Sequence, residues 1–269
     1  MLVMLIPALV AACLLGALTL LPGRTNILVL GLDSREPGSN VGRSDTLILS
    51  TFVPRQPYVG LLSIPRDLWV TLPNGYGENR INTAHFFAEA EMPGSGPEAA
   101  METVRQNFGV DVHHYVRIRF DGFLDLVDLL GGVEIELAEP MSGYPAGKHL
   151  LDSEQALAFV RDRAGSDDFY RMQRGQIFLK GIMKRVLSPE VLPRLPKLIP
   201  LMWAMVDTDV PVIKWPQLLI TLLRIGTDGL DTRTITREMT FPFTTSEGAQ
   251  VLGPNWAAIN PVLLEMFGQ

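Results

Sequence analysis

The sequence has very little cysteine and no long basic block, and both shortages narrow the protein's class. Its 269 residues include one cysteine, Cys13, so an intramolecular disulfide framework is excluded and the fold must rely on its own core. The formal net charge is −6, and no run rich in Lys and Arg stands out. Broad nucleic-acid binding requires a basic surface, so we expect no nucleic-acid partner and only a local anion site.

Several familiar catalytic patterns are also missing. The four histidines, at positions 85, 113, 114 and 149, lack the spacing of metal ligands. The sequence has no Gly-x-Ser-x-Gly elbow, no Walker loop and no cysteine beyond the first 21 residues. His113 and His114 are expected to be structural, whereas His85 stays open as a candidate base. Chemistry based on a serine, cysteine or histidine nucleophile therefore has little support.

The first 21 residues contain no charged side chain and consist mostly of Leu, Ala, Val and Met. At 1.5 Å per residue, a helix of this length spans about 31 Å, enough to cross the hydrocarbon core of a membrane. We predict a single-pass anchor over 1–21, a short link over 22–25 and a domain outside the cell, although Arg24 weakly opposes that orientation. A lipoprotein cleavage box ending at Cys13 is the alternative.

Three short apolar runs, at 27–30, 46–49 and 59–64, predict strands because Gly31 and Pro65 interrupt them. Pro54 and Pro57 predict a turn between the second and third strands, which makes those strands antiparallel neighbours. If the polar loop 34–44 closes a first hairpin, six charged residues meet at one edge of the sheet: Asp33, Arg35, Arg43, Asp45, Arg66 and Asp67. Such a set is either a solvated rim of salt bridges or a site for a metal-bridged phosphate.

The rest of the chain alternates helices with strands. Further strands are expected at 69–72, 113–120 and 133–137, and helices at 83–91, 98–108, 123–130, 151–160, 168–187, 198–205, 217–225 and 261–267. This alternation predicts a three-layer α/β/α sandwich around a mixed β-sheet, formed by one domain over 26–269. Trp203, Trp215 and Trp256 are expected to be packing residues.

Four arginines gather around the start of the helix expected at 168–187: Arg161, Arg163, Arg171 and Arg174. Cations near a helix N-terminus oppose the helix dipole, unless Asp167 and Asp168 offset them or an anion binds there. We favour the anion. Asp152 followed by Gln155 predicts a capping box that starts the preceding helix.

The order of several motifs resembles the LytR-CpsA-Psr family of bacterial envelope proteins. The matching stretches are GLDSR at 31–35, GRSDT at 42–46, SIPRD at 63–67, NRIN at 79–82, LLGGV at 129–133 and ALAFVRDR at 156–163. The resemblance covers about residues 26–187. It implies a phosphotransferase that moves a glycopolymer phosphate from a polyprenyl pyrophosphate carrier to a peptidoglycan hydroxyl. A non-catalytic polyprenyl-phosphate binding protein and a lipid pyrophosphatase are the alternatives.

The resemblance also implies roles for individual residues. Asp33 and Asp45 would share one Mg²⁺ or another divalent cation, and with Arg66 and Arg161 they would form the catalytic set. Substrate binding would fall to Arg43, Arg66, Arg161, Arg163, Arg171, Arg174 and Gln176. One position departs from the family pattern, which usually has Arg-Gln-Gln where this chain has Arg174, Gly175 and Gln176. The polar residue expected at 175 to contact phosphate is absent.

Overall fold

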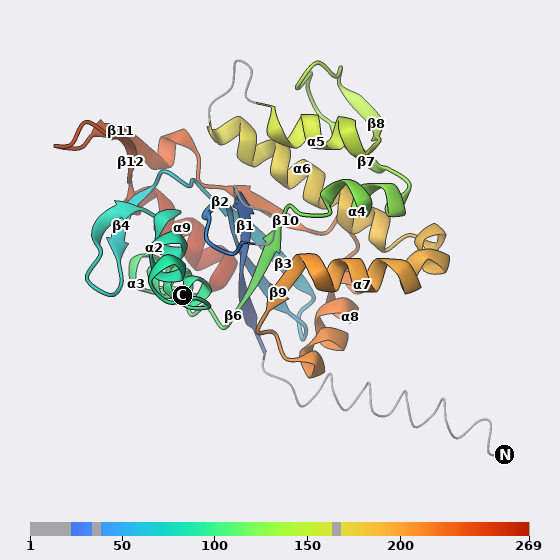
Figure 1. Ribbon diagram of the computed structural model, residues 1–269, viewed down its shortest axis with the longest axis horizontal. Helices are drawn as coiled ribbons and strands as arrows, with labels where there is room; N and C mark the ends of the chain where they lie inside the picture. The colour runs from blue at the N-terminus through green and yellow to red at the C-terminus, as the bar shows by residue number, and fades with distance from the viewer. Residues whose placement is uncertain (1–22, 34–38, 163–167, 269) are drawn as a thin grey trace.

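The computed structural model describes residues 23–162 and 168–268, apart from a gap at 34–38 (Figure 1). The predicted anchor at 1–21, together with Arg35, Arg163 and Asp167, lies outside this part, as do the side chains of Asp33 and Asp168. Among the helices of the described ranges, none combines the length and the apolar character needed to cross a membrane.

A six-stranded mixed sheet forms the centre of the molecule, with the order β10-β3-β2-β1-β6-β9. Its strands are β1 (Thr25–Asp33), β2 (Arg43–Val53), β3 (Tyr58–Ile64), β6 (His114–Arg119), β9 (Val206–Thr208) and β10 (Asp231–Thr234). Strand β2 is antiparallel to both β1 and β3, whereas β1 runs parallel to β6. Both predicted antiparallel pairs are confirmed, and so is the mixed sheet.

Alternating side chains send apolar residues to both faces of this sheet. Leu47 and Leu49 of β2 face a core completed by α2 (Thr83–Glu91), α3 (Gly96–Phe108) and α9 (Trp256–Phe267). Ile48 faces the other way, toward α6 (Asp168–Val186) and α8 (Trp215–Ile225). Because side chains in a strand alternate with a period of two, one strand serves both cores.

A third core lies on the outer side of α6 (Figure 1). Its elements are α4 (Phe123–Leu130), β7 (Val133–Leu137), β8 (Gly147–Leu151), α5 (Ser153–Arg161), the 3₁₀ helix η1 (Pro189–Arg194) and α7 (Leu195–Met205). Strand β7 approaches α6 closely at Gly181, where an added Cβ would lie 2.6 Å from the carbonyl oxygen of Glu134. Glycine is required at this position because any side chain would push β7 away.

The sequence-based predictions miss several short strands and misplace the start of some helices. Strands β5 (Gly77–Arg80), β8, β9, β10, β11 (Thr240–Thr244) and β12 (Gln250–Pro254) were not predicted. Leu151 ends β8 rather than starting a helix, although the capping box of Asp152 and Gln155 is confirmed for α5. Helix α9 begins at Trp256, before the expected start at Pro261, because Pro261 is accommodated inside it.

The tryptophans do not share one environment. Trp256 packs against Phe108, with ring centroids 5.3 Å apart, as expected of a packing residue. Trp203 packs against Trp215, with ring centroids 5.2 Å apart, but it is 62% exposed and lies outside the buried cores. A tryptophan in an apolar helix is ordinarily a core residue, and sequence gives no sign of which face the fold leaves uncovered.

Candidate functional site

Asp45 lies at a β-bulge between β1 and β2. Gly31 is opposite Thr46 and Leu32 is opposite Ser44, so Asp45 is the extra residue that the ladder leaves unpaired. The close pairing there suits Gly31, because a Cβ on it would lie 2.9 Å from the Cβ of Thr46. Bulges bend a strand and redirect a side chain, and they are common beside functional sites. Here the bulge turns both the carboxylate and the carbonyl of Asp45 toward other elements.

The segment after β3 delivers a second set of polar residues to Asp45. Pro65 ends β3, and Arg66 and Asp67 follow it directly. The chain then forms the hairpin of β4 (Trp69–Leu72) and β5. After β5, Asn82 lies beside Arg66, and its backbone N–H donates to the backbone carbonyl of Arg66 at 3.3 Å. Arg66 and Asn82 therefore reach the same carboxylate from the two ends of one hairpin.

Alternating charges run through this corner of the molecule. Arg66 Nη1 donates to Asp45 Oδ2 at 3.0 Å, while its Nε lies 3.6 Å from Asp67 Oδ2. Arg80 Nε contacts Asp67 Oδ1 at 3.0 Å, and Asn82 Nδ2 is 3.4 Å from Asp45 Oδ1.

Arg171, in the first turn of α6, reaches Asp45 from the opposite side. Its Nη2 donates to the Asp45 carbonyl oxygen at 3.2 Å, and its Nη1 lies 3.9 Å from Asp45 Oδ2. Arg66 and Arg171 are 105 positions apart in the sequence and meet at one carboxylate. Among the described residues, Arg80 and Asp67 extend this network, which joins the guanidiniums of three arginines to two carboxylates.

Gln176 fixes the position of α6 over the sheet. Its Nε2 donates to Ser63 Oγ on β3 at 2.8 Å and to the Arg233 carbonyl on β10 at 2.6 Å. These two hydrogen bonds hold the first turns of α6 against the strands, and thereby place Arg171 beside Asp45. The contact of Gln176 with phosphate stays a prediction, because the described hydrogen bonds of its amide are to the sheet.

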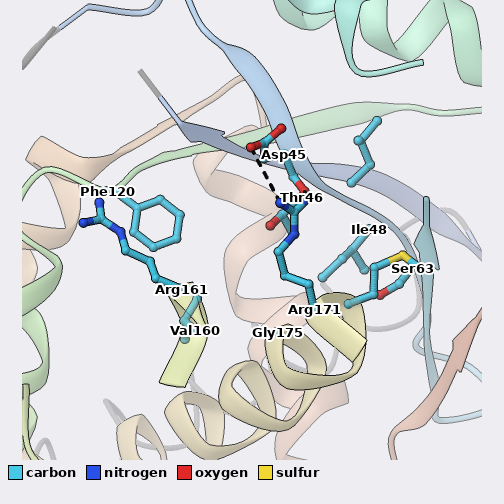
Figure 2. A pocket seen from close by; sticks show the side chains of 11 residues that line it. Asp45, Thr46, Ile48, Ser63, Phe120, Val160, Arg161, Arg171 and Gly175 are labelled. Carbon is cyan, nitrogen blue, oxygen red and sulfur yellow. Dashed lines mark hydrogen bonds and ion pairs between the residues drawn. The ribbon is translucent and has the colours of Figure 1, made fainter. Parts of the chain in front are cut away.

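A cavity of about 420 Å³ opens beside Asp45, between β2, β3, α5 and α6. Figure 2 shows Asp45 and Arg171 pointing toward each other at this cavity, whereas the side chain of Arg161 extends away from Arg171. The lining also contains apolar residues, among them Leu47, Ile48, Val160 and Met172. A cavity that combines charged with apolar residues suits a ligand with an anionic head and a hydrocarbon tail.

Arg174 opens onto a different cavity. It lines a space of about 620 Å³ with Tyr144 and Tyr170, and its guanidinium donates to the Asp162 carbonyl. Burial lowers the pKa of Arg174 from its ordinary value. Residues three apart on a helix differ by about 60° around its axis. The small rotation is enough to put Arg171 and Arg174 into separate cavities.

The remaining predicted site residues are distributed as follows. Arg43 is exposed at the start of β2, paired in register with Asp33 at the end of β1. Arg161 is the last residue of α5 and is exposed. The predicted roles of Asp33 and Arg163 concern side chains outside the described part. Of the predicted substrate-binding arginines, Arg66 and Arg171 are therefore the two that share a described contact, at Asp45.

His85 lies away from Asp45, in a buried polar network under the loop before β2. Arg117 Nη1 is 3.3 Å from His85 Nε2 and can only donate, so Nε2 accepts and Nδ1 donates to the Gly42 carbonyl at 3.1 Å. Arg117 also pairs with Glu89 at 3.2 Å. Burial lowers the pKa of His85 to about 4. The imidazole is neutral and fully engaged, which makes it a structural residue rather than the base considered above.

The sequence analysis assigns no individual role to Asn82 or Arg80, which both belong to the network around Asp45. The only sequence feature that points to them is the family resemblance of residues 79–82. Their placement depends on the return of β5 beside β4, and the polar sequence of β5 does not predict a strand.

Comparisons with known proteins show to which family the chain is similar. The model of the LytR-CpsA-Psr family matches residues 21–262. A relative from Oceanobacillus iheyensis, named polyisoprenyl-teichoic acid–peptidoglycan teichoic acid transferase TagU, is 33% identical over 72% of this chain and 61% of its own length. The protein of the same name from Enterococcus faecalis is 35% identical over 61% of this chain and 54% of its own length. The chain thus spans little more than half the length of these relatives.

Solved structures show the same fold. B. subtilis TagV superposes with a TM-score of 0.71 and 24% identity, over 92% of this chain and 99% of that one. A structure of TagT bound to LIIa-WTA gives a TM-score of 0.67 and 23% identity, over 92% of each chain. The family model matches most of the sequence, and the chain therefore belongs to the LytR-CpsA-Psr family.

Proposed function

We propose that the chain is a phosphotransferase that moves a glycopolymer phosphate from a polyprenyl pyrophosphate carrier to a hydroxyl of peptidoglycan. One observation carries this proposal: Arg66 and Arg171 converge on Asp45, which lines a cavity together with several apolar side chains. The printed names of the relatives, which describe transfer of teichoic acid from a polyisoprenyl carrier to peptidoglycan, support the same substrate class.

The proposed reaction is a displacement at phosphorus. The acceptor hydroxyl oxygen forms a bond to the phosphorus that bears the glycan, and its proton leaves to water. The bond from that phosphorus to the bridging oxygen breaks, and polyprenyl phosphate departs with the electron pair. Arg66 and Arg171 bind the phosphate oxygens and stabilise charge there, since phosphoryl transfer depends mainly on positioning and electrostatics. The apolar lining at Ile48 and Met172 receives the first part of the prenyl chain.

The donor set suits a divalent cation that is bound jointly with phosphate. No cluster of three or more His, Cys, Asp or Glu side chains exists among the described residues, so they form no complete cage for a metal. Mg²⁺ commonly takes one or two carboxylates and completes its shell with water and phosphate oxygens. Asp45 would supply one carboxylate, and Asp33, at the end of the adjacent strand, would supply the second. Bound there, Mg²⁺ neutralises charge on the pyrophosphate.

We further propose that residues 1–21 anchor the chain in the cell membrane and that the domain lies on the extracellular side. The absence of charge over 21 residues supports the anchor, and a carrier lipid and a peptidoglycan acceptor meet outside the membrane. Protease added to intact protoplasts should digest the domain. Protection of the domain would reverse the topology.

Gly175 keeps a second function open, that of a non-catalytic polyprenyl-phosphate binding protein. It lines the cavity beside Arg171, and an added Cβ there would meet nothing within 4 Å. The family's usual polar side chain would therefore have room, but this chain lacks it. A site that binds phosphate without completing the transfer is consistent with that loss.

One experiment separates these functions from lipid pyrophosphate hydrolysis. The full chain is incubated in detergent with a polyprenyl-pyrophosphate-linked glycan and Mg²⁺, with and without peptidoglycan. Transferase activity gives glycan on peptidoglycan, and release of polyprenyl phosphate depends on the acceptor. Release without acceptor indicates a pyrophosphatase, and binding without release indicates the non-catalytic protein. Either of the last two results contradicts the proposal.

A further inference from the structure

Helix α8 buries polar side chains and exposes apolar ones, which is the reverse of an ordinary surface helix. Gln217 and Thr221 are 3% and 1% exposed, whereas Trp215, Leu219 and Leu223 are exposed. The exposed three recur at intervals of four residues, so they form one stripe along the helix. A surface helix of a water-soluble domain normally turns such a stripe inward and its polar residues outward. The outer face of α8 is therefore adapted to an apolar environment.

The apolar stripe continues onto neighbouring elements. Trp203 of α7 lies against Trp215, with ring centroids 5.2 Å apart, and joins the two helices. Large exposed apolar side chains make up what we call the α7–α8 apolar surface: Ile199, Met202, Trp203, Val212, Ile213, Trp215, Leu219 and Leu223. Ile213, in the 3₁₀ helix η2 (Val212–Lys214), is 73% exposed. Contiguous exposed apolar patches usually mark an interaction site.

Both cations and carboxylates lie around this surface. Arg194, Lys197, Lys214 and Arg224 belong to its helical segments, and Asp207 and Asp209 lie between α7 and η2, where Asp207 is paired with Arg117 and Asp209 lies 3.4 Å from His114 Nδ1. Tryptophans combined with flanking cations are typical of the interfacial layer of membranes, where the rings lie among the headgroups and the cations attract anionic lipids. A bare apolar patch would suit many partners, but paired tryptophans with cations beside them fit the headgroup layer of a bilayer.

The surface also lies at the end of the sheet where β1 begins. Lys214 Nζ is 2.9 Å from His114 Nε2, and His114 is opposite Ile27 of β1. Arg224 Nη1 donates to the Pro54 carbonyl, in the turn beyond the pairing of Phe52 with Thr25. Figure 1 shows α8 at this end of the central strands, whereas α5 lies toward the other end. The uncharged stretch 1–21 precedes Thr25 by only a few residues in the sequence.

We propose that the α7–α8 apolar surface lies in the headgroup layer of the membrane and fixes the orientation of the domain on it. The inference rests on the membrane anchor proposed above, because a short link holds this end of the sheet at the bilayer. Asp45, which lies in register between Gly31 and Leu32, is toward the other end of β1, about 21 Å from Thr25 at 3.3 Å per residue. The orientation thus turns Asp45, Arg66 and Arg171 toward the cell wall.

Tryptophan quenching tests the orientation. The full chain is reconstituted into vesicles of phosphatidylcholine and phosphatidylglycerol, with acyl chains brominated near the headgroup or left unmodified. The chain has four tryptophans, so Trp203→Phe/Trp215→Phe leaves Trp69 and Trp256 as reporters, and Trp69→Phe/Trp256→Phe is the matched control. We expect the first pair of substitutions to remove more than roughly half of the bromine-dependent quenching, and the control pair to remove little of it.

A charge substitution provides an independent measurement. Leu219→Asp/Leu223→Asp should reduce bromine quenching about twofold or more, since carboxylates are repelled by anionic lipid, whereas Leu264→Asp, at an exposed position of α9, should not. Flotation after a carbonate wash reports the anchor separately. A chain that does not float overturns the anchor and the orientation together. A chain that floats but keeps its quenching in the Trp203→Phe/Trp215→Phe variant overturns the orientation alone, as does emission that bromine never quenches because a second copy covers the surface.

Discussion

Replacing Arg171 with alanine tests directly whether this side chain binds the phosphate of the substrate. The Arg171 side chain is 17% exposed, and its guanidinium donates to the Asp45 carbonyl beside the cavity. A charge-assisted hydrogen bond to phosphate contributes about 1.5–3 kcal/mol, so the Kd for a prenyl pyrophosphate should rise about 10- to 150-fold. Lysine should not restore the affinity, because an ammonium cannot reproduce the planar fork of a guanidinium.

The fold itself should tolerate this change. The ion pair with Asp45 is long and partly exposed, so losing it should alter the free energy of unfolding by less than about 1 kcal/mol. Calorimetric titration with farnesyl pyrophosphate and Mg²⁺ measures the affinity, and chemical denaturation measures the stability. Arg55→Ala, in the exposed turn between β2 and β3, is the matched control because it removes the same charge elsewhere. Unchanged binding by Arg171→Ala, or its unfolding, would refute the proposed clamp.

Three further predictions, which use four substitutions, test separate parts of the structure. Asp45→Asn should abolish the dependence of prenyl pyrophosphate affinity on Mg²⁺, as measured by titration with and without the ion; a persisting dependence removes Asp45 from the metal site. Gly175→Ala should stabilise α6 by roughly 0.5–1 kcal/mol in chemical denaturation, because its Cβ meets nothing, whereas Gly181→Ala should destabilise by forcing β7 away; equal effects would contradict the packing of α6. His85 has a folded pKa of about 4, below its unfolded value of 6.5, so the unfolded chain takes up the proton first as pH falls. Stability should therefore decline between about pH 6.5 and 4, by up to about 3 kcal/mol, and then level off. His85→Gln should lack that part of the decline in unfolding titrations; an identical pH dependence would show that His85 is not held neutral.

The three strands around Asp45 could be predicted because their signals are local. Gly31, Pro54 and Pro65 mark turns within a few residues of each apolar run, and the antiparallel pairing follows from those turns. The convergence of Arg66 with Asp45 follows in the same way. The bulge at Asp45 could not be predicted. It depends on a single extra residue in the ladder, and apolar periodicity does not register such a shift.

The contacts that define the site most closely come from tertiary packing. Asn82 reaches Asp45 because β5 returns along β4, and no apolar pattern in residues 77–80 indicates a strand. Arg171 and Arg174 carry the same charge and lie only three positions apart in the sequence. In the structure, however, they line two different cavities, because they point in different directions around the axis of α6. The rotation is set by Gln176, whose hydrogen bonds to Ser63 and Arg233 join segments far apart in the chain.

The central claim is that Arg66 and Arg171 hold a pyrophosphate beside Asp45. A crystal structure of the chain with a short prenyl pyrophosphate and Mg²⁺ measures this directly. The phosphate oxygens should lie within about 3 Å of both guanidiniums, with the prenyl chain against Ile48 and Met172. A pyrophosphate found instead in the cavity beside Arg174, with Arg66 and Arg171 still paired to Asp45, would contradict it.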